Sequence, residues 1–104
     1  MIRTKKSVFL LLLLVMGAHH LQAQQRIISG KITDSDGQEL PGANVLIKNT
    51  NKGTITDHEG VYEIMVSGPS DTLNFSFIGF REFETVVGEK SVINVTMYAD
   101  AEEL

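Results

Sequence analysis

Residues 52–66 read KGTITDHEGVYEIMV, which is a strand-like run, a turn and a second strand-like run. In the second run, Tyr62, Ile64 and Val66 alternate with residues that point to the opposite face. A period of two, rich in β-branched and aromatic residues, is typical of a half-buried strand. The four residues from Asp57 to Gly60 have the composition of a tight turn. The segment therefore predicts two short strands joined by a hairpin turn.

The same alternation recurs along most of the chain. Further strand-like runs are RIISGKIT (26–33), ANVLIK (43–48), TLNFSFIG (72–79), REFETVV (81–87) and SVINVTM (91–97). Glycine- or proline-containing turns separate them at intervals of about 8–12 residues, the spacing of an all-β sandwich or barrel. No amphipathic helical segment follows Gln24. We predict an all-β fold, a small antiparallel β-sandwich of six to seven strands.

The alternation also predicts which side chains form the core. The predicted core residues are Ile28, Ile32, Val45, Ile47, Tyr62, Ile64, Leu73, Phe75, Phe77, Ile93 and Val95, and the predicted exposed residues include Glu82, Glu84 and Lys90. An alternative for Phe75, Phe77, Phe80 and Phe83 is a platform on which sugars stack. Because Phe75 and Phe77 share a strand face with Leu73, as a sandwich core requires, we favour the core. The pattern leaves Phe80 and Phe83 open.

The first 23 residues have the three-part pattern of a secretory signal peptide. Three basic residues lie among the first six, an apolar run covers 8–18, and Ala23 is the small residue before the expected cut. A membrane-spanning helix needs ~18 or more apolar residues, so a permanent anchor is the weaker alternative. Leu21 is larger than the usual residue at its position. We predict a signal peptide at 1–23.

Composition limits what the mature chain can bind. Cleavage after Ala23 leaves 81 of the 104 residues, enough for one domain, and removal of three positive charges changes the net charge from −4 to −7. Nucleic acid and anionic lipid repel such a chain. It has no cysteine, so neither a disulfide nor a lipoprotein anchor is available. The domain must be stabilised by its core alone.

Asp57, His58 and Glu59 form the acid–histidine–acid group from which metal and acid–base sites are often built. The zinc motif H-E-x-x-H would need a second histidine where the chain has Tyr62, and no other histidine follows the signal segment. The hexapeptide ITDHEG also repeats ITDSDG at 32–37, in which the glycine is misplaced for an EF-hand loop. We therefore interpret the cluster as a turn. We predict no catalytic, cofactor-binding or metal-binding residue, and no cofactor.

Two tripeptides match the N-glycosylation pattern, Asn74-Phe75-Ser76 and Asn94-Val95-Thr96. Both lie in predicted strands of a chain that looks bacterial. We interpret these polar residues as part of the outer faces of the sheets.

The segment ISGKITDSDGQELPGANVLIKNTNKGTITDHEGVYEIMV (28–66) resembles the carboxypeptidase-regulatory-like domain. The residues in register with that family's pattern are Gly30, Asp34, Gly37, Pro41-Gly42-Ala43, Val45, Ile47, Gly53, Thr54, Thr56, Asp57, Gly60, Tyr62 and Ile64. The family's usual Gly-Thr is Asn49-Thr50 here, a mild departure because asparagine also tolerates the left-handed conformation. The downstream segments 73–80 and 92–97 match the pattern too.

The resemblance implies a transthyretin-like (prealbumin-like) sandwich without catalytic residues. In Bacteroidota this domain most often opens the chain of SusC/RagA-type TonB-dependent outer-membrane transporters. We therefore expect a signal peptide at 1–23, the domain at 24–97, and an acidic linker at 98–104 that leads toward a missing TonB box. The implied partners are the plug and barrel of the same chain and, through the full-length transporter, the TonB complex and a SusD-like lipoprotein. The implied location is the periplasmic side of the outer membrane.

Two alternatives to this role remain. The first is a free-standing or protease-linked exported binding module. The second is an enzyme, because the transthyretin-like fold includes a hydroxyisourate hydrolase. That activity needs several histidines, an arginine and a Tyr-Arg-Gly-Ser tail, whereas this chain keeps one histidine after the signal segment and has Tyr98-Ala99-Asp100-Ala101. Fold likeness alone says little about function.

Overall fold

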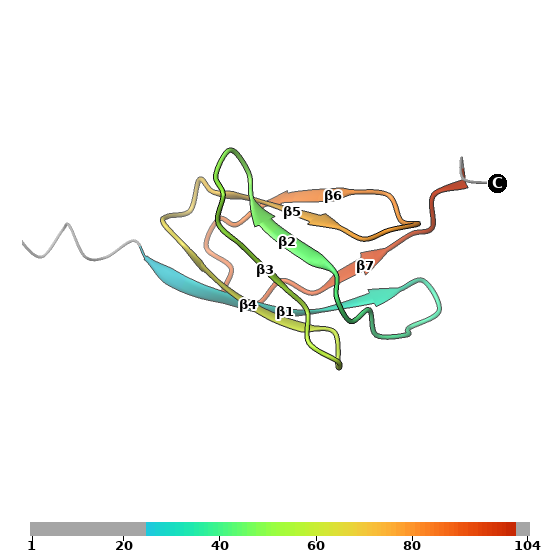
Figure 1. Cartoon of the computed structure of the whole chain (residues 1–104). Coiled ribbons are helices and arrows are strands. Elements are labelled where there is room, and N and C mark those ends of the chain that lie inside the picture. Colours follow the sequence, from blue (N-terminus) through green and yellow to red (C-terminus); the bar gives the residue numbers. More distant parts are fainter. Residues whose placement is uncertain (1–24, 102–104) are drawn as a thin grey trace, which may run out of the picture.

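Seven strands form two sheets that pack face to face in the computed structural model, which describes residues 25–101 (Figure 1). The strands are β1 (Arg26–Asp34), β2 (Asn44–Ile47), β3 (Gly53–Ile55), β4 (Val61–Val66), β5 (Thr72–Ser76), β6 (Phe83–Val86) and β7 (Val95–Met97). One sheet has the order β4-β1-β7 and the other β3-β2-β5-β6. The predicted all-β sandwich is confirmed. The predicted signal peptide lies outside the described residues.

Strand direction departs from the sequence prediction at one place. β4 pairs with β1 in antiparallel fashion, as do the neighbours within the four-stranded sheet. β7 pairs with β1 in parallel, with Ile32 opposite Val95. The alternation of side chains assigns residues to faces but carries no information on direction, so the sequence could not reveal this pairing.

The core lies between the two sheets and contains nearly all of the predicted residues. The buried hydrophobic residues are Ile28, Ile32, Leu40, Ala43, Val45, Ile47, Tyr62, Ile64, Val66, Leu73, Phe75, Val87, Ile93, Val95 and Met97. Phe77 was predicted among them but is only partly buried, and its ring packs edge-on against Phe80 with centroids 5.7 Å apart. Phe83 is 44% exposed. Phe77 is the first residue after the end of β5 at Ser76 and packs against the edge of the core.

Among residues 25–101 there is no helix long and apolar enough to cross a membrane. Glu82, Glu84 and Lys90 are exposed, as the alternation predicts. β2, β4, β5 and β7 alternate buried with less buried residues, whereas β3 and β6 at the edges of the four-stranded sheet bury none.

Candidate functional site

The Asp57–Gly60 segment is a turn, and the Asp57 carboxylate stabilises it by accepting backbone hydrogen bonds. Asp57 Oδ1 accepts hydrogen bonds from the backbone N–H groups of Val61 (3.0 Å) and Glu59 (2.9 Å). The Gly60 N–H donates to the Asp57 carbonyl at 3.0 Å, and Gly60 has a φ of 78°, which glycine adopts at little cost. The amides of Val61 and Glu59 lower the pKa of Asp57. The carboxylate is thus committed to the backbone.

The ITDSDG segment makes the same turn a second time. Asp34 Oδ1 accepts from the backbone N–H groups of Asp36 and Gln38, both at 2.9 Å. The Gly37 N–H donates to the Asp34 carbonyl at 3.0 Å, with a φ of 84° at Gly37. The repeated sequence therefore encodes a repeated local structure, an aspartate that folds the chain back on itself. This confirms that both hexapeptides are turns.

The prediction of a hairpin between β3 and β4 is wrong in one respect. The Asp57 N–H does donate to the Val61 carbonyl at 2.9 Å, but β3 belongs to the four-stranded sheet and β4 to the three-stranded sheet. The turn therefore carries the chain from one sheet to the other. Thr56, buried just before it, fixes the corner: its hydroxyl donates to Leu40 O (2.6 Å) and accepts from Ala43 N (2.9 Å).

The remaining two members of the acid–histidine–acid cluster point into solvent. His58 Nε2 lies 3.6 Å from Glu59 Oε1, and the two side chains are 88% and 66% exposed. No group of three or more His, Cys, Asp or Glu side chains within residues 25–101 is arranged to hold a metal ion. Asp57, His58 and Glu59 thus lie together in the turn, but their side chains do not converge on one point. That the chain has no catalytic, cofactor-binding or metal-binding residue stays a prediction.

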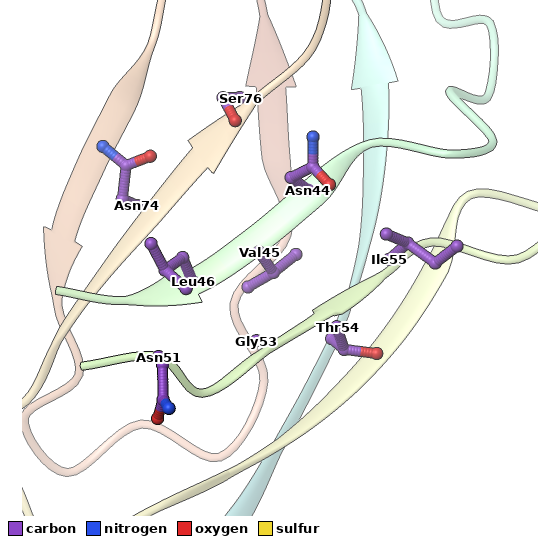
Figure 2. A pocket seen from close by; sticks show the side chains of 9 residues that line it. All are labelled: Asn44, Val45, Leu46, Asn51, Gly53, Thr54, Ile55, Asn74 and Ser76. Carbon is purple, nitrogen blue, oxygen red and sulfur yellow. The ribbon is translucent and has the colours of Figure 1, made fainter.

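A shallow hollow of about 600 Å³ lies on the outer face of the four-stranded sheet (Figure 2). Its lining residues come from β2, β3, β5 and the β2–β3 loop: Asn44, Val45, Leu46, Asn51, Gly53, Thr54, Ile55, Asn74 and Ser76. Leu46 lies opposite Gly53 on one side and Asn74 on the other. Because Gly53 has no side chain, the Leu46 side chain stays 40% exposed. No sequence pattern predicts this hollow, because it depends on the register between strands.

The lining of the hollow limits its chemistry. It contains amides, hydroxyls and two exposed aliphatic side chains, but no acid, base or cationic residue. Asn74 Nδ2 donates to Glu84 at 3.2 Å, and Lys48 donates to the same carboxylate at 3.1 Å. The hydrogen bonds from Lys48 and then Asn74 lower the pKa of Glu84. The lining thus offers neutral hydrogen-bonding contacts, and the Glu84 carboxylate is bonded to Asn74 beside them.

Tyr62 and Gly30 form a contact of a different kind, inside the sandwich. The Tyr62 hydroxyl donates to the Ile93 carbonyl at 2.6 Å, and burial raises the pKa of Tyr62 to about 12. A Cβ on Gly30 would lie 1.9 Å from the same carbonyl oxygen. Glycine is therefore required here so that the Ile93 carbonyl can enter the core and reach the tyrosine. Sequence reasoning missed this contact, because it joins residues far apart in the chain.

Comparison with known proteins identifies the family. The sequence pattern of the CarboxypepD_reg-like domain matches residues 28–104. The chain belongs to this family. It is 40% identical over 100 residues to TonB-dependent receptor P3 of Formosa agariphila, covering 95% of this chain and 10% of that receptor. It is 37% identical over 82 residues to TonB-dependent receptor SusC of Bacteroides thetaiotaomicron, covering 79% of this chain and 8% of that receptor.

Solved structures support the fold alone. A chain in a type II cohesin–X-dockerin complex from Acetivibrio cellulolyticus, an N-terminal interface mutant, superposes with a TM-score of 0.60 at 21% identity. The match covers 70% of this chain and 57% of that one. The corresponding C-terminal interface mutant gives a TM-score of 0.53 at 21% identity, over 67% and 51% of the two chains. At this identity the likeness concerns architecture and not binding.

The geometry accounts for the residues that mark a CarboxypepD_reg-like domain. Asp34 and Asp57 close the two repeated turns, Thr56 holds the corner between the sheets, and Gly30 with Tyr62 admits the Ile93 carbonyl. Each of these is a contact within the domain. In this chain the pattern therefore specifies a fold, and the chain spans about a tenth of the receptors that it resembles.

Proposed function

We propose that this chain is the non-catalytic, periplasmic N-terminal domain of a TonB-dependent outer-membrane nutrient transporter of the SusC/RagA type. The observation that carries the proposal is the 40% identity to a TonB-dependent receptor over 95% of this chain but only 10% of the receptor. A match of that extent describes one module of a much longer polypeptide. The three other receptor matches likewise cover 7–9% of their proteins.

The order of segments supports the periplasmic location. The expected signal peptide at 1–23 would export the chain, and the domain at 24–97 follows it directly. A plug and barrel encoded after the linker at 98–104 would insert in the outer membrane and leave the domain beneath them. The first partner is therefore the rest of the same chain. The TonB complex and a SusD-like lipoprotein are further partners, reached through the full-length transporter.

Hydrogen bonds after β7 support the proposal that the chain leaves the domain at a fixed position. The Arg81 N–H donates to the Tyr98 carbonyl, and the Asp100 N–H donates to the Gly79 carbonyl, both at 2.9 Å. Residues 98–100 thus leave the three-stranded sheet and pair with the loop between β5 and β6. These bonds hold the first residues of the expected linker against the domain for three residues beyond the strand end at Met97. The domain would hold a downstream segment at a short and defined distance.

Deletion of residues 27–97 in the full-length transporter tests this role. The signal segment and everything after residue 97 are kept, and the quantity of barrel in the outer membrane is measured beside growth on the imported nutrient. We expect normal barrel levels with reduced growth. A matched control carries His58→Ala, which changes an exposed side chain of the turn and is expected to transport normally. Unchanged growth of the deletion strain at normal barrel levels would remove the proposed role.

A further inference from the structure

The first and last strands of the domain lie side by side and run in the same direction. Ile32, Thr33 and Asp34 of β1 pair in parallel with Val95, Thr96 and Met97 of β7. β1 begins at one end of the molecule, and β7 and the described end of the chain leave at the other (Figure 1). A force that pulls the two chain ends apart therefore acts along both strands, in opposite directions. It strains the hydrogen bonds between β1 and β7 together, and not one after another.

Hydrogen bonds join the two strands well beyond the three paired residues of β7. The Ser29 N–H donates to the Ser91 carbonyl (3.0 Å), and the Ile93 N–H donates to the Ser29 carbonyl (2.9 Å). The Lys31 N–H donates to the side chain of Asn94 at 2.9 Å. The Asn94 carboxamide thus takes the place of a backbone carbonyl, because the Ile93 carbonyl has turned into the core. The contact therefore extends from Ser29 to Asp34, and the Asn94 side chain bridges the interruption of the ladder at residues 93–94.

The core resists sliding of β7 along β1. Ile93, Val95 and Met97 are buried, with exposed fractions of 7%, 4% and 1%. A shift by one residue would move these side chains to the solvent face and bring polar ones inside. The buried hydrogen bond from the Tyr62 hydroxyl to the Ile93 carbonyl adds a second attachment, from β4, at the same place. Sliding therefore breaks hydrogen bonds and core packing at once.

We propose that the β1–β7 pairing is a mechanical clamp, which keeps the domain folded while its two ends are pulled apart. The clamp follows from strand direction, register and burial within residues 25–101, and does not depend on the proposed function. A pull between the two ends of the folded domain loads this pairing in shear.

Single-molecule pulling in two directions tests the clamp in the 104-residue chain. The chain has no cysteine, so pairs of introduced cysteines provide unique handles. The pair Gln25→Cys and Ala101→Cys pulls along the strands, whereas Gln38→Cys with Ala101→Cys pulls from the end that β1 shares with β7. All three positions are exposed. Either pull first loads the bonds of Tyr98 and Asp100 to the β5–β6 loop, and the second direction then peels β1 and β7 apart bond by bond from Asp34 and Met97.

We expect the force of unfolding to be roughly two- to threefold higher in the first direction, because several evenly spaced bonds of a parallel pair share the load. Asn94→Ala removes the acceptor of the Lys31 amide and lowers the force in the first direction. Lys48→Ala, which breaks an ion pair on the other sheet, serves as the matched control and leaves the force unchanged. Equal forces in the two directions would overturn the clamp, as would an Asn94→Ala chain that stays folded and unfolds at the original force.

Discussion

Replacement of Tyr62 by phenylalanine removes one oxygen atom from the core and leaves the packing in place. The hydroxyl is the donor to the Ile93 carbonyl at 2.6 Å, and the residue is only 2% exposed. The ring also packs edge-on against Phe75, with centroids 5.6 Å apart and an interplanar angle of 71°. Because phenylalanine keeps this ring contact, the substitution isolates the hydrogen bond. The Ile93 carbonyl is then left in the core without this donor.

The size of the effect follows from that unsatisfied acceptor. Leaving a buried polar group without its partner costs about 1–3 kcal/mol, more than the roughly 1 kcal/mol that an average hydrogen bond contributes. The pKa of Tyr62 is raised to about 12 in the folded chain, above the value near 10 of an unperturbed tyrosine. A raised pKa contributes stability that is fully present below about pH 10 and is lost as the pH rises toward 12. The Tyr62→Phe chain lacks this contribution.

Urea unfolding at pH 7 and at several values between pH 9 and 12 measures both effects. We expect the variant to lose about 1–3 kcal/mol of unfolding free energy at pH 7 with an unchanged m value. The difference between variant and parent is expected to shrink above pH 10. A variant as stable as the parent at pH 7 would refute the hydrogen bond to the Ile93 carbonyl, and a difference independent of pH up to 12 would refute the burial of the hydroxyl.

Four further substitutions follow from the same geometry. Gly30→Ala places a Cβ 1.9 Å from the Ile93 carbonyl oxygen, so we expect a loss of about 1–3 kcal/mol or more by urea unfolding; wild-type stability would show that this carbonyl does not occupy the core. Phe75→Ala removes a fully buried ring and is expected to lower the free energy of unfolding by about 3–5 kcal/mol, measured by thermal unfolding. A small effect would instead favour the alternative in which Phe75 belongs to an exposed platform for sugars. The lowered pKa of Asp57 means that its carboxylate stabilises the fold above the unfolded pKa, and that this stability is lost as the pH falls through the folded pKa. Asp57→Asn removes this contribution, so we expect a lower free energy of unfolding at neutral pH and a weaker dependence on acid, measured by urea unfolding. His58→Ala is expected to leave that acid profile unchanged, and calorimetry of the two changes combined tests metal binding: stoichiometric zinc or calcium binding that they abolish would contradict the turn assignment.

The sequence predicted those parts of the fold that depend on neighbours along the chain. The alternation placed Tyr62 and Ile64 inside, and the repeated hexapeptides predicted two turns of the same kind. Each depends on the local backbone and the residue's own chemistry. The prediction that Phe77 belongs to the core was only partly right, because its burial depends on where β5 ends.

The pairing of strands that are far apart in the chain could not be predicted from the sequence, for a physical reason. A turn between two strand-like runs has the same composition whether the runs pair with each other or continue into different sheets, so the separation of β3 from β4 carried no local signal. The parallel pairing of β1 with β7 joins residues 63 positions apart, and the hydrogen bond from Tyr62 to the Ile93 carbonyl joins residues 31 positions apart. Only the packed structure brings these groups together.

The central claim, that this domain is one module of an outer-membrane transporter, is tested most directly by detecting the native polypeptide. An antibody raised against the domain is applied to outer-membrane, periplasmic and cytoplasmic fractions of the source cells, and the size of the recognised chain is measured. The account predicts one polypeptide roughly ten times as long as this chain, found in the outer-membrane fraction. A recognised chain no longer than the domain itself, free in the periplasmic fraction, would contradict it.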